Sequence, residues 1–306
     1  MTLKSKLMIA AAALIGSVAA ASAQTRVIVV SHGQANDGFW SVVKNGVSAA
    51  AKDQGIQVEY RAPETFDMVA MSQLIDAAVA QKPTGLVVSI PDASALGPAI
   101  KKAVAAGIPV ISMNSGSDVS KGLGAMLHVG QDEYDAGKAA GAKLKDMGAK
   151  NGLCINQEVG NVALDLRCKG FGDGLGKSKT LPTSNDPSEI LAKTKAALSA
   201  DGTIDAIISV GSMAGEPALK AVKETGVKAQ VATFDLPAGF MKEVAAGNAA
   251  FGIDQQQYLQ GYLPVTFLAL YAKYGLMPGG NVPSGPNLIT KDKAAQVIDL
   301  ATKGIR

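Results

Sequence analysis

The stretch RVIVVSHGQANDGFWSVVKNGVSAAAKDQG, residues 26–55, decides the fold class. It opens with a β-branched run, Arg26–Ser31, and passes through a polar segment. It then takes on a helical pattern over Phe39–Gln54 that ends at Gly55. The first run is continuously apolar rather than alternating, which is typical of a strand buried on both faces of a parallel sheet. The stretch therefore predicts one strand–helix unit of an α/β protein.

This unit recurs along the chain. Further strands are expected at 57–61, 85–90, 109–113, 126–129, 152–156, 206–210, 230–234 and 250–253, and further helices at 67–81, 93–106, 133–147, 164–174, 189–200, 216–224 and 239–246. Repeated units of this kind imply doubly wound parallel sheets with right-handed crossovers. About ten strands would make a large single sheet, so we expect two sheets in two lobes.

The places where the chain passes between the lobes are also predicted. The segment 114–124 is rich in Ser and Gly and divides the series, so we expect the first crossing there. A long helix over 257–274 would return to the first lobe, and 287–306 would cross again. The predicted N-terminal lobe is residues 24–125 and 256–285, and the predicted C-terminal lobe is residues 126–255 and 286–306. A multi-strand hinge would join them and leave a cleft between them.

The first 23 residues read as a targeting segment. Lys4 and Lys6 precede the apolar run Leu7–Ala20, and Ala21-Ser22-Ala23 supplies the small residues that signal peptidase accepts. The run is shorter than the ~20 apolar residues that span a bilayer. We therefore predict a signal peptide, residues 1–23, that is cleaved after Ala23 and directs export.

Composition excludes several classes of protein. The 306 residues include 29 basic and 26 acidic side chains, a net charge of +3, which is too small for the basic field that nucleic acid or anionic lipid requires. A hydrophobic content of 47% at this low net charge is the opposite of the signature of disorder. We expect a folded protein with no nucleic-acid partner.

Export would place both cysteines in an oxidising compartment. Cys154 lies in an apolar run, and Cys168 follows 14 residues later in the helix expected to pack over that strand. Two interpretations stay open, a disulfide or a pair of buried thiols. Metal binding is not expected from two cysteines with no nearby His.

Polar residues follow most of the predicted strands. In open α/β sheets, ligands bind beyond the carboxyl ends of the strands. The segments found there are 31–40, 89–92, 114–115, 157–158, 211–212, residue 235 and 254–255. Their amides and carboxylates suit paired hydroxyls, and their aromatic pair suits the C–H face of a sugar ring. These segments predict a site for a neutral polyhydroxyl ligand.

Segments that resemble catalytic or phosphate-binding motifs do not match the required patterns. Gly172–Ser178 lacks the first Gly of a phosphate loop, because that position is Phe171. Gly211–Gly215 has its Ser in the wrong slot for a nucleophile elbow. Asp132–Asp135 opens a helix, where carboxylates favour the positive end of the dipole, so we interpret it as capping. The sequence predicts no catalytic residue, metal or cofactor.

Five segments in order carry a family resemblance: Asn36–Trp40, Ile108–Asn114, Leu166–Phe171, Thr233–Asp235 and Ile253–Gln255. Together they resemble the type I periplasmic sugar-binding proteins, in particular the ribose-binding group, whose fold is shared with the ligand-binding core of LacI-type repressors. The resemblance covers essentially the whole mature chain. It implies the periplasmic binding protein type I fold and a location in the periplasm.

The resemblance also implies the function. The protein would be the substrate-binding component of an ABC importer, a monomer rather than an enzyme, which binds a monosaccharide or polyol between its lobes and partners a membrane permease. Aromatic rings would stack on the ligand, and polar side chains would bond its hydroxyls. The candidate binding residues are Asn36, Phe39, Trp40, Asp92, Asn114, Arg167, Ser212, Asp235 and Gln255. Replacing Arg167 or Asp235 by Ala is expected to abolish binding and leave the fold intact.

The sequence departs from the family pattern in three places. Asn114 replaces the usual Asp, Gly211-Ser212 stands where the ribose group has Asn-Asp, and no aromatic residue lies near Pro187–Leu191. We therefore expect stacking from one lobe and a flexible polyol or unusual sugar as readily as ribose. Two other functions remain as alternatives. One is a sensor subunit that presents ligand to a chemoreceptor or kinase, and the other is an exported α/β hydrolase that would use His32 or His128.

Overall fold

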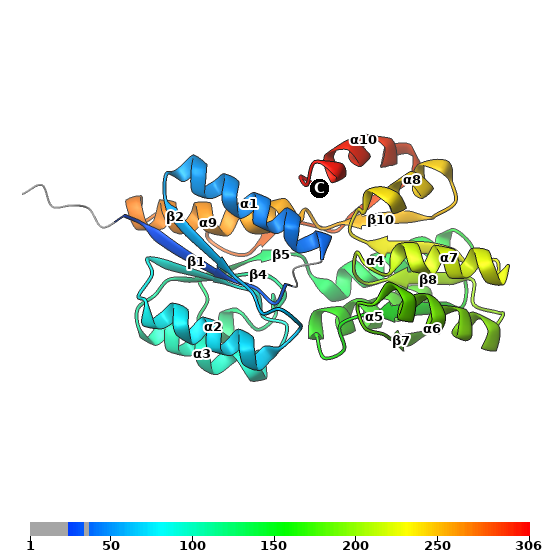
Figure 1. Ribbon diagram of the computed structural model, residues 1–306, viewed down its shortest axis with the longest axis horizontal. Coiled ribbons are helices and arrows are strands. Elements are labelled where there is room, and N and C mark those ends of the chain that lie inside the picture. Colours follow the sequence, from blue (N-terminus) through cyan, green and yellow to red (C-terminus); the bar gives the residue numbers. More distant parts are fainter. Residues whose placement is uncertain (1–23, 34–36) are drawn as a thin grey trace, which may run out of the picture.

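A computed structural model describes residues 24–33 and 37–306. The predicted signal peptide and Asn36 lie outside these residues. Two six-stranded sheets are present, one in each of two lobes (Figure 1). Their strand orders are β11-β5-β4-β3-β1-β2 and β12-β10-β9-β8-β6-β7, and every pair is parallel except β10 with β12. The predicted fold class, with two doubly wound lobes, is confirmed.

The first lobe has helices on both faces of its sheet. One core lies beneath α1 and α9, and the other beneath α2 and α3 (Figure 1). The strands are β1 (Arg26–Val30), β2 (Gln57–Arg61), β3 (Gly85–Val88), β4 (Val110–Asn114), β5 (Leu127–Gly130) and β11 (Val282–Pro283). The helices are α1 (Gly38–Gln54), α2 (Met68–Ala80), α3 (Ala93–Ala105), α9 (Gln257–Tyr274) and the short 3₁₀ helix η1 (Lys121–Leu123).

The second lobe repeats this layering. Helices α4 and α5 cover one face, and α6, α7, α8 and α10 cover the other. The strands are β6 (Gly152–Asn156), β7 (Ser178–Pro182), β8 (Ala206–Ser209), β9 (Gln230–Phe234), β10 (Phe251–Asp254) and β12 (Asn287–Ile289). The helices are α4 (Glu133–Asp146), α5 (Val162–Leu175), α6 (Pro187–Ala200), α7 (Gly215–Thr225), α8 (Ala238–Ala246) and α10 (Lys291–Thr302).

The expected first crossing at 114–124 is wrong. Strand β5 pairs with β4, so the chain leaves the first lobe only after Gly130, and the predicted lobe boundary at residue 125 divides that lobe before its fifth strand. The Ser- and Gly-rich segment instead makes turns inside the lobe, with Gly116 and Gly124 at positive φ. Leu123 packs against the core beneath α3. Small residues marked tight turns here, not a linker between lobes.

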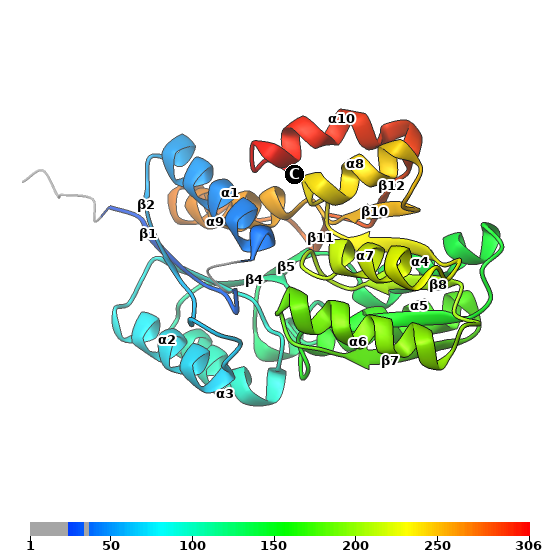
Figure 2. The same cartoon turned by 45° about the vertical axis from the view of Figure 1, so that its right-hand side comes forward.

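Three segments, residues 131–132, 255–256 and 284–286, connect the lobes and form the predicted multi-strand hinge (Figure 2). Hydrogen bonds tie them together. The Ser284 amide donates to the Gly130 carbonyl at 2.7 Å, and the side chain of Gln256 donates to the Ser284 carbonyl at 2.8 Å. The side chain of Gln260 donates to Ser284 Oγ at 3.0 Å. These bonds join the second and third crossing segments to each other and to the end of β5.

The C-terminal tail lies against this hinge. The Arg306 guanidinium pairs with Asp254, a fully buried carboxylate where β10 enters the hinge. Two residues earlier, the Gly304 carbonyl accepts a hydrogen bond of 2.9 Å from the Asn45 side chain of α1. The tail that follows α10 thus contacts the first lobe as well as the hinge.

Helices α4 and α5 pack at backbone distance. A Cβ atom on Gly137 of α4 would lie 2.1 Å from the Arg167 carbonyl oxygen, and one on Gly170 of α5 would lie 2.0 Å from the Tyr134 carbonyl oxygen. Only glycine fits at such separations. The contact fixes the start of α4, including Glu133, beside Arg167 of α5.

The cysteines form a disulfide between Cys154 of β6 and Cys168 of α5, which resolves the alternative left open by the sequence. Their Cα atoms are 5.6 Å apart, inside the range of unstrained bridges. We expect the bond to contribute about 3 kcal/mol to the free energy of unfolding, because it closes a loop of about 15 residues in the unfolded chain. Urea unfolding with and without reductant measures this contribution.

The double variant C154A/C168A is the control for this measurement. Its unfolding midpoint should match that of the reduced wild type and should not respond to reductant. A wild-type midpoint that reductant leaves unchanged would show that the disulfide does not contribute to stability.

Candidate functional site

A small cavity of about 30 Å³ lies between the lobes, at the carboxyl ends of both sets of strands. The first lobe and the hinge line it with His32, Asp37, Phe39, Trp40, Asn114 and Gln255. The second lobe lines it with Gln157, Glu158, Leu164, Arg167, Gly211, Ser212 and Asp235. The strand-end argument from the sequence predicts this location.

All predicted binding residues except Asn36 and Asp92 line this one cavity. Asn36 falls outside the described residues. Asp92 caps α3 instead, and its carboxylate accepts hydrogen bonds from the amides of Ser94 at 2.8 Å and Ala95 at 3.1 Å. Asp92 is therefore removed from the candidate site.

Arg167 is the central cation of the site. Its side chain is buried, and Nε and Nη2 donate to the two carboxylate oxygens of Glu133 at 2.5 and 3.0 Å. Nη1 donates to the Val210 carbonyl at 2.8 Å, and Nη2 also reaches Gln255 Oε1 at 3.2 Å. The guanidinium lies 4.3 Å from the centre of the Phe234 ring. Its orientation is therefore fixed on several sides.

The role of Glu133 was predicted wrongly. Asp132 does cap α4, with an acceptor distance of 2.9 Å from the Asp135 amide, but Glu133 is only 3% exposed and forms the ion pair with Arg167. Removing one partner of a buried ion pair leaves the other charge buried and uncompensated, which lowers the free energy of unfolding by about 3–5 kcal/mol. Arg167→Ala is therefore expected to weaken the fold as well as binding, contrary to the expectation from sequence.

Two polar site residues have an unusual backbone. Asn114 has φ 61° and Asp235 has φ 67°, the left-handed region that Asn and Asp tolerate better than most side chains. Non-glycine residues in this conformation cluster at functional sites. Asn114 is the last residue of β4 and Asp235 directly follows β9, and both side chains line the cavity.

Amide side chains link these residues. Gln255 Nε2 donates to Asp235 Oδ1 at 2.8 Å, and Asn114 Nδ2 donates to Gln260 Oε1 at 3.2 Å. The family's usual Asp at position 114 has no N–H and would meet Gln260 Oε1 with a second acceptor. The departure at Asn114 is thus matched by its local partner.

The aromatic residues come from the first lobe. Trp40 meets Phe39 edge-on with ring centres 5.0 Å apart, and it meets His32 at 4.8 Å. A Cβ atom on Gly33 would lie 2.3 Å from Trp40 Cγ, so Gly33 leaves the room that this ring fills. Both rings also belong to the first lobe's core, and the second lobe adds Leu164 to the lining.

Three buried carboxyl groups line the cavity, those of Asp37, Glu158 and Asp235. Burial raises the pKa of Asp235 to about 7, opposed in part by the charge of Arg167, and burial raises the pKa of Glu158 to about 7 as well. Burial also raises the pKa of Asp37, against hydrogen bonds from Phe39 and Ser212 that lower it. Burial and then Arg167 lower the pKa of His32 to about 3, so its imidazole is neutral at pH 7.

Sequence reasoning did not select Asp37 or Glu158. The signal was present, because both stand in the polar segments that follow β1 and β6. Asp37 caps α1 through the Phe39 amide at 2.9 Å and lines the cavity as well. Asp92 also follows a strand and caps a helix, but it does not line the cavity. A position at the end of a strand therefore does not distinguish Asp37 from Asp92.

The two lobes touch across the cavity. Ser212 Oγ donates to Asp37 Oδ1 at 2.8 Å, and the Val162 amide donates to the Pro91 carbonyl at 3.1 Å. His32 Nε2 lies 3.8 Å from Glu158 Oε2. These contacts hold the lobes in a closed arrangement.

The residues described do not assemble a catalytic or metal centre at this cavity. His32 Nδ1 bonds Ser89 Oγ at 2.7 Å, but Ser89 is fully buried and outside the lining. Within residues 24–33 and 37–306, no group of three potential metal-ligating side chains occurs. Across that same part of the chain, every helix is too short or too polar to cross a membrane.

Two doubly wound lobes, a three-segment hinge and a polar cavity between them define a bilobal solute-binding protein. The chain belongs to the family of the periplasmic binding protein domain, whose sequence profile matches residues 27–276. This membership confirms the resemblance drawn from the five sequence segments. It also confirms that the chain is a binding protein and not an enzyme.

Individual relatives span most of the chain. A carbohydrate transporter from Acidothermus cellulolyticus, solved in complex with myo-inositol, is 37% identical with a TM-score of 0.89, over 92% of this chain and all of that one. An ABC transporter solute-binding protein from Burkholderia graminis, solved with D-arabinose, shares the fold at 21% identity and a TM-score of 0.79, over 88% of this chain and 96% of that one. The xylose/arabinose-binding protein XylF of Sulfolobus acidocaldarius is 24% identical over 287 residues, 87% of this chain and 71% of that protein.

Proposed function

We propose that this protein is the substrate-binding component of an ABC importer and binds a monosaccharide or polyol in the interlobe cavity. The observation that carries this proposal is the convergence of Trp40, Arg167, Asp235 and Gln255 on one cavity between hinged lobes. Arg167 and the amides supply donors, and the carboxyls supply acceptors, so each ligand hydroxyl can find a partner. Trp40 and Phe39 supply apolar surface from one side.

A cyclitol such as myo-inositol is the first ligand to test. The relative solved with myo-inositol is 37% identical to this chain. A cyclitol presents hydroxyls around its whole ring, which matches polar groups contributed by both lobes. The departures from the ribose pattern at Asn114 and Ser212 also favour a ligand other than ribose.

Ligand entry requires the lobes to separate. The cavity of about 30 Å³ is far below the ~300–1,000 Å³ of typical small-molecule sites. Hinge opening would break the Ser212–Asp37 bond, and closure around ligand is the motion expected of this architecture. In the proposed cycle, the exported monomer binds its ligand in the periplasm and docks in the closed form on a membrane permease.

Thermal unfolding of the mature chain with myo-inositol, D-arabinose and D-xylose tests the proposal. A ligand at about one hundred times its dissociation constant should stabilise the protein by ~2.7 kcal/mol. The fluorescence of Trp40, the single tryptophan, should change at the same ligand concentrations. If no neutral monosaccharide or polyol moves either signal, the proposed function is wrong.

A further inference from the structure

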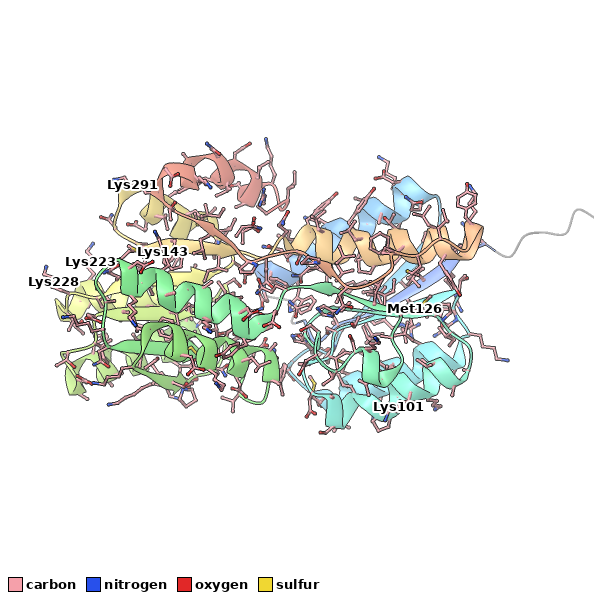
Figure 3. The ribbon with its side chains drawn as sticks, turned by 180° about the vertical axis from the view of Figure 1, so that it is seen from behind. Lys101, Met126, Lys143, Lys223, Lys228 and Lys291 are labelled. Carbon is pink, nitrogen blue, oxygen red and sulfur yellow. A yellow bond between two sulfur atoms is a disulfide. The ribbon has the colours of Figure 1, made fainter. Side chains whose placement is uncertain are left out.

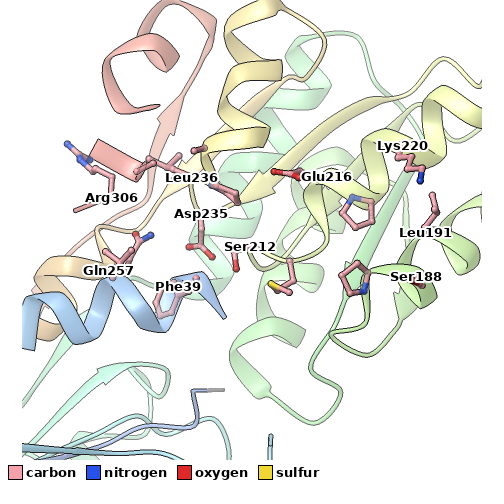
Figure 4. Close-up of a pocket in the computed structure, with 18 residues that line it drawn as sticks. Phe39, Ser188, Leu191, Ser212, Glu216, Lys220, Asp235, Leu236, Gln257 and Arg306 are labelled. Carbon is pink, nitrogen blue, oxygen red and sulfur yellow. The ribbon is translucent and has the colours of Figure 1, made fainter. Parts of the chain in front are cut away.

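A second, much larger space adjoins the cavity. It is a groove of about 650 Å³ that runs between the first turn of α1 and the second lobe (Figure 4). The starts of α6, α7 and α8 form its far wall, and the start of α9 and the C-terminal tail form its near end. Its volume lies inside the range of small-molecule sites, whereas the cavity's volume does not.

The groove and the cavity share one wall. Phe39, Ser212 and Asp235 line both spaces. Phe39 belongs to the first lobe, while Ser212 and Asp235 belong to the second, so this wall is a seam between lobes. The hydrogen bond from Ser212 to Asp37 closes the seam in this structure. A ligand held between slightly separated lobes could therefore extend through the seam into the groove.

One buried group in the groove lacks a partner. Gln257 is 2% exposed and lines the groove, and its Oε1 accepts no hydrogen bond from residues 24–33 or 37–306. Figure 4 shows its side chain beside Phe39 and across from Asp235. A buried acceptor without a hydrogen bond is unfavourable, so a ligand donor that reaches Gln257 when the lobes separate would stabilise the complex.

The other walls suit a neutral ring with hydroxyls. Leu191, Met213 and Leu236 offer apolar surface, and Glu216 and Lys220 offer an acceptor and a donor at the outer side. Lys220 lies on the groove side of α7, whereas Lys223 of the same helix is seen at the far end of the second lobe (Figure 3). The mix of apolar and hydrogen-bonding groups resembles that of the cavity but carries no aromatic plate beyond Phe39.

We propose that this groove is a second subsite, which holds a further sugar ring joined by a glycosidic bond to the unit in the cavity. The inference rests on the proposed function and extends it: the protein takes a glycosylated polyol or disaccharide. The hydroxyls of the second ring donate to Gln257 Oε1, and its C–H face packs on Leu236 at the same end of the groove. The ligand thereby bridges the two lobes at two places.

Calorimetric titration with myo-inositol and its α-galactoside, galactinol, tests the subsite. The wild type should bind galactinol about tenfold more tightly than myo-inositol. Ser188→Trp places a large ring in the groove from an exposed position on α6, away from the cavity. It should reduce galactinol affinity about tenfold and leave the myo-inositol affinity unchanged.

Two further variants complete the design. Gln257→Leu keeps the size of the side chain and removes the acceptor, and it should weaken galactinol selectively. Ser199→Trp makes the same substitution on the same helix at an exposed position outside the groove, so it should change neither affinity. Thermal unfolding without ligand shows whether each variant is folded.

The results separate the two proposals. Binding of myo-inositol together with weaker or absent binding of galactinol would overturn the second subsite and leave the proposed function standing. Equal effects of Ser188→Trp on both ligands, or on neither, would overturn the subsite as well. If the screen selects D-xylose instead of myo-inositol, xylobiose takes the place of galactinol. If no small sugar or polyol binds to the folded protein, both proposals fail.

Discussion

Replacing Arg167 by Met is expected to abolish ligand binding and to lower the free energy of unfolding by about 3–5 kcal/mol. Met keeps an unbranched side chain but removes the guanidinium that lies over the Phe234 ring, and it leaves Glu133, only 3% exposed, without its ion-pair partner. It also removes the donors to the Val210 carbonyl and Gln255. Urea unfolding measures the loss of stability, and calorimetric titration measures the loss of affinity.

The double variant E133Q/R167M separates the two effects. It removes the uncompensated charge, so much of the stability should return, because replacing both members of a buried ion pair is often nearly neutral. Binding should not return, since the ligand's central donor is still missing. Wild-type affinity in the single variant would remove Arg167 from the site.

The second large effect concerns pH. The pKa values of Asp235 and Glu158 are raised by burial from 3.8 and 4.5 to about 7. Between those values the folded free protein holds protons that the unfolded chain has released. The contribution of these two groups to stability should therefore be most favourable below about pH 4 and should fall as the pH rises from about 4 to about 7.

Ligand affinity should show the opposite trend. Hydroxyls that donate to Asp235 and Glu158 require the ionised carboxylates, so binding releases protons. Affinity should rise with pH up to about 7, by up to tenfold per pH unit for each proton released. Titration at pH 6 in buffers of different ionisation heat counts those protons. His32 does not contribute in this range, because its pKa is about 3.

Asp235→Asn is the matched variant for this experiment, since it keeps the size of the side chain and cannot ionise. The number of protons released on binding should fall by about one relative to wild type. If the variant binds too weakly to titrate, its unfolding between pH 4 and 8 still reports the missing group as a shallower decline in stability. Wild-type affinity that is constant between pH 5.5 and 8 would contradict the coupling.

The architecture was largely predictable because parallel strands buried on both faces must be continuously apolar. Val27–Val30 and Ala206–Ile208 show this pattern. Strand β7 was not predicted from the sequence because it is an edge strand with exposed residues. Strands β11 and β12 were not predicted because they are only two and three residues long. The first crossing was misplaced because the pairing of β5 with β4 is a long-range contact that a local run of Ser and Gly does not report.

The residues of the candidate site were also only partly predictable from the sequence. Arg167, Asp235 and Gln255 were found through the carboxyl ends of the strands, a consequence of topology. Glu133 was missed because a carboxylate at a helix start has the same sequence whether it faces solvent or is turned inward. The close packing of α4 on α5 decides between these outcomes, and it depends on glycines whose partners lie about 30 residues away.

The tail that ends at Arg306 has a practical consequence. Because Arg306 pairs with Asp254 and Gly304 with Asn45, a reporter protein fused behind Arg306 would pull directly on the bending region. Such a fusion would convert lobe motion into a signal, and for the same reason it would distort affinity measurements. A purification handle on the amino-terminal side of β1 would avoid this region, since β1 starts at the end of the first lobe that points away from the second (Figure 1).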